Sequence, residues 1–167
     1  MASQVNSARF RPGTGWSSRP AGRVALAELA RYLGALAVLG VGVAHIQQYY
    51  VDSYSAIPTI GTLFALNFAS ATVVTLGLVA PVRRLAGRWA SATLAGLALG
   101  GIMIAAGSLA GLFVSENGGL FGFMEQGYRQ AIVISIALEV ATVILLGLFL
   151  AMNGLGVRLR DRRISPR

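Results

Sequence analysis

The sequence has 167 residues and a net charge of +8, with 55% hydrophobic and only 12% charged residues. About 25% of the residues in an average soluble domain are charged, so this composition excludes a soluble domain. The high hydrophobicity also excludes a disordered chain, and the lack of cysteine excludes a disulfide scaffold. A compact integral membrane protein is the class that remains.

Four stretches of the chain are almost free of charge. They cover residues 32–51, 53–82, 89–115 and 130–157, and only Glu139 interrupts the last one. A helix crosses a hydrocarbon core of about 30 Å with about 20 residues, so each stretch holds one helix and none holds two. The sequence therefore predicts an all-α fold, an integral membrane four-helix bundle with helices at about 32–50, 58–80, 90–114 and 131–152.

Helix-breaking residues divide the chain at the expected helix ends. Pro58 can begin the second helix, and Asn153-Gly154 can end the fourth. The predicted organisation is a flexible cytoplasmic tail at 1–23, the four-helix domain at 24–152 and a basic cytoplasmic tail at 153–167.

The arginines lie almost entirely on one side of the predicted bundle. All except Arg129 fall in the N-terminal segment, in the loop between the second and third helices, or in the C-terminal tail. The positive-inside rule then places both termini in the cytoplasm. Glu28 and Arg31, one helical turn apart on this side, can form an ion pair. Because the basic charge orients the chain in a lipid bilayer, we do not expect nucleic acid as a partner.

Glycines repeat at helix-packing intervals in the third predicted helix. They are Gly96, Gly100, Gly107 and Gly111, which form two GxxxG spacings. Small residues let membrane helices approach closely. We expect this face to pack inside the bundle, and the alternative is that it joins two copies of the chain.

Polar residues inside the apolar stretches are the candidate functional residues. Glu139, Asn67 and His45 all fall in the predicted outer half of the membrane, and Ser135 lies one turn from Glu139. A carboxyl group at mid-bilayer costs about 2.5–3.5 kcal/mol, so Glu139 should face the bundle interior. It is either a protonated group that hydrogen-bonds to Asn67 or Ser135 and joins the helices, or part of a proton, ion or ligand site.

His45 is the only histidine, and the simplest interpretation is that it hydrogen-bonds within the bundle. A haem ligand is the alternative, with Met103 as the axial partner within one chain. One histidine and no cysteine are too few for a structural metal, so we expect neither metal nor cofactor. The sequence also carries no catalytic motif, and we do not expect an enzyme.

Four segments resemble those of small four-helix membrane proteins common in actinobacteria. They are AHIQQY at 44–49, SAIPTIGTLFALN at 55–67, GLFGFME at 119–125 and SIALE at 135–139. A more distant similarity to DoxX-type membrane proteins rests on size and helix number. The resemblance implies a multi-pass protein of the bacterial cell (inner) membrane and supplies no activity.

Two classes of function remain from the sequence. The first is an accessory or structural subunit of a larger membrane complex, with the lipid bilayer and another membrane protein or a second copy as partners. The second is a proton, small-ligand or quinone site built around Glu139.

Overall fold

The computed structural model describes residues 21–125, 127 and 129–164. Within these residues the chain is helical and has no strand apart from an isolated bridge between Leu120 and Phe123. The elements are α1 (Ala21–Val51), η1 (Tyr54–Ala56), α2 (Pro58–Val79), α3 (Val82–Leu85), η2 (Gly87–Trp89), α4 (Ala90–Asn117) and α5 (Gln130–Ile164). Helices α1, α2, α4 and α5 are long and apolar enough to cross a membrane, which confirms four apolar helices in an all-α fold.

Residues 24–31 can extend the first predicted helix on its inner side, and the structure confirms it, because α1 begins at Ala21 and continues without a break into the predicted span at 32–50. Helix α5 passes through Asn153-Gly154, where we expected it to end, and runs to Ile164. The side chain of Asn153 does not end the helix but donates a hydrogen bond to Ser91 Oγ at the start of α4, over 3.2 Å. The predicted tail at 1–23 lies outside the described residues as far as residue 20.

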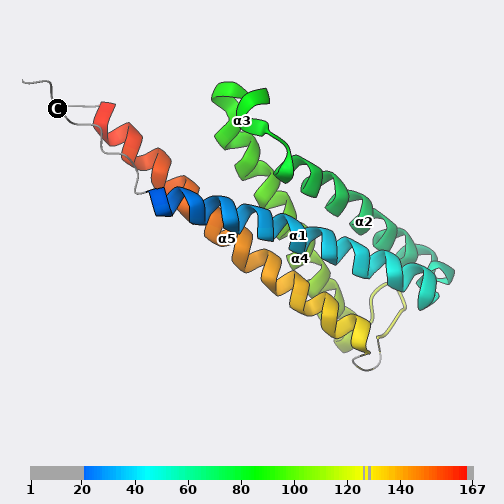
Figure 1. Cartoon of the computed structure of the whole chain (residues 1–167). Helices are drawn as coiled ribbons and strands as arrows, with labels where there is room; N and C mark the ends of the chain where they lie inside the picture. The colour runs from blue at the N-terminus through cyan, green and yellow to red at the C-terminus, as the bar shows by residue number, and fades with distance from the viewer. Residues whose placement is uncertain (1–20, 126, 128, 165–167) are drawn as a thin grey trace, which may run out of the picture.

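Helix α1 lies between α2 and α5 (Figure 1). It packs along α2 on one side and α5 on the other, and α4 packs against α5. Contact between α2 and α4 is sparser than any of these three. The short α3 and η2 lie at one end of the bundle, which we call the arginine end, and the segments 52–57 and 118–125 lie at the other, the loop end.

The tightest packing lies toward the arginine end and centres on Leu146, which is fully buried. Gly34 of α1 and Gly101 of α4 both face it. A Cβ atom at Gly101 would lie 2.6 Å from Leu146 Cδ1 and 3.0 Å from Val38 Cγ2. Small residues therefore bring three helices together here, as expected where lipid supplies no hydrophobic drive.

The predicted glycine face of α4 is not the face that packs. A Cβ atom at Gly96 or Gly107 would meet nothing within 4 Å, and one at Gly100 or Gly111 would make only ordinary contacts. The buried face of α4 instead carries Leu94, Ala98, Gly101 and Ala105. Packing of the GxxxG face inside the bundle is therefore corrected: α4 is rotated so that Gly101 points inward.

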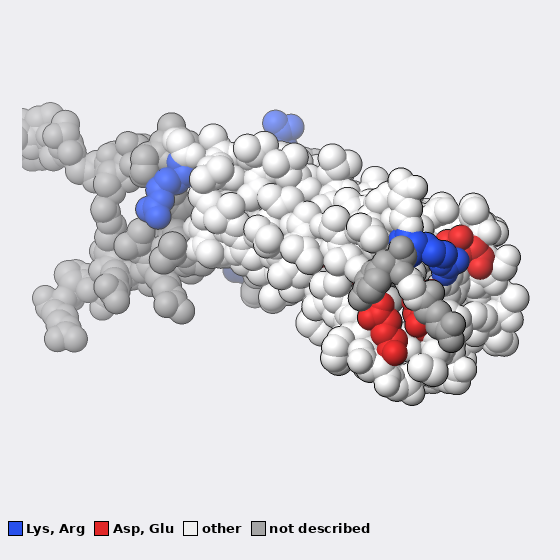
Figure 2. All heavy atoms as spheres, turned by 90° about the horizontal axis from the view of Figure 1, so that it is seen from below, with Lys and Arg blue, Asp and Glu red and all other residues white. Residues whose placement is uncertain are grey.

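An ion cluster holds the helices together at the arginine end. Arg31 is only 5% exposed. Its Nη1 donates to Leu78 O in the last turn of α2 over 2.8 Å, and its Nη2 lies 2.6 Å from Glu28 Oε2, which confirms the predicted pair. Glu28 also binds Arg83 of α3. At the opposite end, the loop end, Figure 2 shows acidic side chains gathered beside a basic one, and a broad uncharged surface separates the two ends.

Candidate functional site

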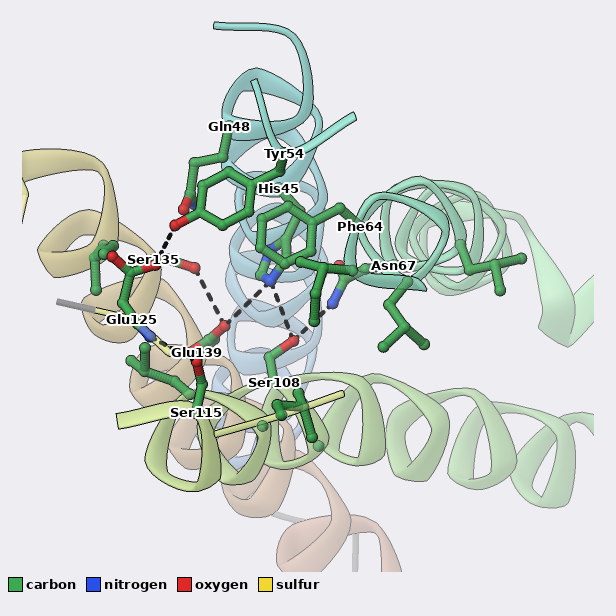
Figure 3. A pocket seen from close by; sticks show the side chains of 18 of the residues that line it. His45, Gln48, Tyr54, Phe64, Asn67, Ser108, Ser115, Glu125, Ser135 and Glu139 are labelled. Atoms are coloured by element: carbon green, nitrogen blue, oxygen red, sulfur yellow. Dashed lines mark hydrogen bonds and ion pairs between the residues drawn. The ribbon is translucent and has the colours of Figure 1, made fainter. Parts of the chain in front are cut away.

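A cavity of about 320 Å³ opens among the four long helices in the half of the bundle nearer the loop end. Its walls are mainly apolar, with Leu63, Leu66, Ile104, Leu112 and Ile132 among the lining residues. A small group of polar side chains faces the same space (Figure 3). We call the side chains of His45, Asn67, Ser108, Ser135 and Glu139 the polar network.

Glu139 of α5 points into the bundle and is 2% exposed. Ser135, one turn earlier, donates a hydrogen bond to Glu139 Oε1 over 3.2 Å. His45 Nε2 of α1 lies 3.9 Å from the same carboxylate oxygen. The structure thus brings Glu139, Ser135 and His45 together around one carboxyl group (Figure 3).

Asn67 is connected to His45 and Glu139 through Ser108. Asn67 Nδ2 of α2 donates to Ser108 Oγ of α4 over 2.7 Å, and Ser108 Oγ lies 3.4 Å from His45 Nε2. The order of contacts is therefore Asn67, Ser108, His45, Glu139. Asn67 binds Ser108 and not Glu139, which was its predicted partner. Each of the four long helices contributes one polar side chain to this series.

The backbone of α1 fixes the orientation of the His45 ring. Nδ1 lies 2.9 Å from Val41 O, one turn earlier. A carbonyl oxygen can only accept, so Nδ1 carries a proton and the free nitrogen, Nε2, faces Ser108 and Glu139. Two arrangements then leave the pair uncharged overall. Either Glu139 is protonated and His45 is neutral, or Glu139 is ionised and His45 is protonated.

Aromatic rings connect the polar network to the loop end of the cavity. Phe64 of α2 lies edge-on to His45, with ring centroids 4.9 Å apart, and stacks on Tyr54 at 4.8 Å. Tyr54 belongs to η1 and is 3% exposed. Gly61 allows this close approach, because a Cβ atom there would lie 2.8 Å from Tyr54 O.

Tyr54 is also the centre of a second polar cluster, with Ser115, Glu125 and Arg129, which closes the cavity toward the loop end and which we call the roof. Its hydroxyl donates to Glu125 and accepts from Arg129 Nη2 over 2.5 Å. Arg129 further pairs with Asp52 and Glu125, and the backbone N–H of Glu125 donates to Ser115 Oγ over 3.0 Å. Burial and the hydrogen bond to Glu125 raise the pKa of Tyr54, because both favour the neutral phenol.

Sequence reasoning missed several residues of this site. Ser108 gave no signal because a serine in an apolar helix usually satisfies its hydroxyl on the preceding turn of its own backbone. Tyr54 carried only the signal of an interfacial aromatic residue. The hydrogen bond between Glu125 and Ser115 depends on the conformation of the segment that follows α4, which helical periodicity in the sequence does not predict.

Two further expectations concern haem and metal. Met103, the suggested axial partner of His45, is 70% exposed and does not line the cavity, so the fold does not bring the two together. Among the described residues, no three His, Cys, Asp or Glu side chains group in a way that could hold a metal ion.

Comparison with known proteins adds no family to this description. No family model, no curated protein and no solved structure matches the chain. The resemblance to small actinobacterial membrane proteins therefore stays a prediction, and the site is interpreted from its own geometry.

Proposed function

We propose that this chain is a multi-pass membrane protein that binds a small lipophilic molecule with a hydrogen-bonding head group in the cavity among its helices. The observation that carries the proposal is the polar network, in which four helices each direct one polar side chain at a single cavity. Ligand pockets typically have volumes of about 300–1,000 Å³, apolar walls and a few placed polar groups. The cavity fits this description at about 320 Å³.

A role for these polar residues in helix association alone accounts less well for the site. Side chains that only join helices need no space beside them, and a void in a membrane protein core loses packing contacts. The network also keeps unused hydrogen-bonding capacity, since Asn67 Oδ1 is buried and accepts no hydrogen bond from any residue that the structure describes. A ligand that donates a hydrogen bond would satisfy this oxygen.

The charge balance of the site favours a neutral head group. The pair of Glu139 and His45 is uncharged overall in either of its one-proton arrangements. A neutral ligand leaves that balance intact, whereas an ion would add an unpaired charge in a low-dielectric region. A molecule with a hydroxyl or carbonyl head group and an apolar body matches the site, because the head can bond to the polar network and the body can contact the apolar walls.

The topology belongs to the same proposal. We place the arginine end in the cytoplasm of a bacterium and the loop end outside the cell membrane. In support, Arg23, Arg31, Arg83, Arg84 and Arg88 all belong to the arginine end, whereas Asp52, Glu116 and Glu125 belong to the loop end with Arg129. The positive-inside rule assigns these sides. The cavity then lies in the outer half of the membrane.

Co-purification tests the ligand proposal. The protein is extracted in native lipid particles, and the lipophilic molecules that remain bound are identified by mass spectrometry. Asn67→Leu should lose a molecule that the wild type retains, because it removes a polar group that lines the cavity. Thr75→Val is the matched control. Thr75 lies on the same helix as Asn67 but outside the cavity, and its replacement removes a buried hydrogen bond from α2 to Ala35 O of α1.

Retention of the same molecule by Asn67→Leu would contradict the proposal, as would a wild type that retains none above the level of bulk lipid. Substitutions of Glu139 refine the result. Glu139→Gln keeps a donor and an acceptor at the cavity floor and should retain more ligand than Glu139→Leu, which keeps neither.

A second candidate function is an accessory subunit of a larger membrane complex. The small-residue face of α4 favours it, because among the described residues a Cβ atom at Gly96 would meet nothing within 4 Å and one at Gly100 would meet only Val74. Such a face allows close approach of another membrane helix. Native mass spectrometry of the protein released from its membrane checks this candidate, and a stoichiometric second protein or second copy would support it.

A further inference from the structure

The cavity is closed on one side and open on the other. Every lining residue from α1 and α5 is buried, namely His45, Gln48, Ile132, Ser135 and Glu139. Every exposed lining residue comes from α2 or α4, namely Leu63, Leu66, Ser70 and Gly107. The opening therefore lies between α2 and α4, the neighbouring pair with the sparser contact. This side of the bundle faces lipid.

The opening is bounded toward both ends of the bundle. Toward the arginine end, α2 and α4 close on each other where Gly77 faces Leu97 and Gly100 faces Val74. Toward the loop end, the buried side chains of Tyr54 and Ser115 form the roof. What remains is a lateral window, whose rim includes Leu66 of α2 and Gly107 of α4.

Burial increases stepwise from this window to the back wall. Leu66 at the rim is 57% exposed, and its neighbour Asn67 is half-buried. His45 behind it is 7% exposed, and Glu139 on α5 is 2% exposed. A molecule arriving from lipid would meet Asn67 and Ser108 first and the pair of His45 and Glu139 last. The polar side chains from Asn67 to Glu139 therefore line the path from the window to the back wall of the cavity.

Gly107 keeps the window open. It is exposed, lines the cavity, and has no atom within 4 Å of its Cβ position. A larger side chain would fit there without a clash and would cover the rim. Ser108, the next residue in α4, belongs to the polar network, so Gly107 lies between this network and the outside of the bundle.

Resting on the proposed function, we propose that the site takes a long-chain amphiphile with a hydroxyl head directly from the lipid through this window. The head lies among Asn67, Ser108 and His45, and the chain passes between Leu66 and Gly107 into the bilayer. A hydroxyl matches the site because it can donate to the unpartnered Asn67 Oδ1 and accept from the network. The chain can be longer than the cavity, since its far end stays in lipid.

A photoreactive probe tests this path. The probe is a sixteen-carbon alcohol with a diazirine at mid-chain, added to the protein in lipid nanodiscs and activated by light. Labelled residues are located by mass spectrometry. In the wild type we expect labelling on α2 and α4 around Leu66 and Gly107. The matching alkane without a hydroxyl should label only the general lipid-facing surface.

The chain offers a matched pair of variants. Gly107→Leu should lose the labelling at the window, whereas Gly96→Leu should keep it, because Gly96 has equally open surroundings on the same helix but does not line the cavity. Leu66→Trp narrows the window from α2 and should also lose the labelling. Circular dichroism and gel filtration establish that each variant is folded.

Undiminished window labelling in both Gly107→Leu and Leu66→Trp would overturn the lateral path. If Asn67→Leu still loses its co-purified molecule in that case, the cavity is a ligand site reached by another route, and only this inference fails. If the wild type neither retains a molecule nor is labelled at the window, the proposed function fails with it.

Discussion

Replacing Gly101 by alanine tests whether the tight packing toward the arginine end sets the stability of the bundle. The added methyl group would lie 2.6 Å from Leu146 Cδ1 and 3.0 Å from Val38 Cγ2. Both neighbours are almost fully buried, with 0% and 1% of their surface exposed, so neither can move into free space. We therefore expect Gly101→Ala to destabilise the fold.

Gly96→Ala provides the reference for this substitution. Both glycines lie within α4, so both replacements gain the same helix-propensity term of about 0.5–1 kcal/mol. Gly96 has nothing within 4 Å of its Cβ position and incurs no steric cost. The difference between the two variants is then the overpacking cost at Gly101, about 1–3 kcal/mol.

The assay is unfolding by sodium dodecyl sulfate in mixed micelles, followed by circular dichroism. Gly96→Ala should be as stable as the wild type or slightly more stable, and Gly101→Ala should unfold at lower detergent fraction. Unfolding free energies of the two variants within about 0.5 kcal/mol of each other would refute the reasoning, because the inward face of α4 would then not be the one that carries Gly101.

Three further outcomes follow from the two ends of the bundle. Arg31→Gln should lower the unfolding free energy by about 1.5–3 kcal/mol in the same assay, because it removes a charge-assisted hydrogen bond and a pair with Glu28. The raised pKa of Tyr54 stabilises the fold below the pKa of an unfolded tyrosine, so stability should fall as the pH rises above about 10, and Tyr54→Phe should weaken this dependence in alkaline unfolding measurements. Asn117→Cys should react with an impermeant thiol reagent on intact cells and Arg84→Cys should not; the reverse pattern would contradict the proposed orientation.

The sequence was most informative where a residue type is rare in its setting. Charge is scarce inside membrane helices, so the charge-free stretches located all four long helices. For the same reason Glu139, His45 and Asn67 were recognisable as candidates, and the structure places all three at one cavity. Ser108 was not recognisable, because a hydroxyl among glycines and alanines is common in such helices.

The rotation of α4 could not be predicted for a related reason. Small residues lie all around this helix, with Gly96 and Gly100 on one face and Ala98 and Gly101 on another. Neither polarity nor size distinguishes the two faces, so the contacts of the other three helices decide which one is buried. The end of α5 was missed because Asn153 gains a tertiary partner in Ser91, which local sequence does not reveal.

The distribution of the polar network over four helices has a consequence for biogenesis. Helix α5 follows the other three long helices in the chain, and until it docks Glu139 has only Ser135 of its own helix as a partner. A nascent chain that ends before α5 likewise leaves the polar groups of the other three helices without their acid. The polar network is therefore complete only when α5 packs against the other three helices, and we expect a chain without α5 to leave these polar groups unsatisfied.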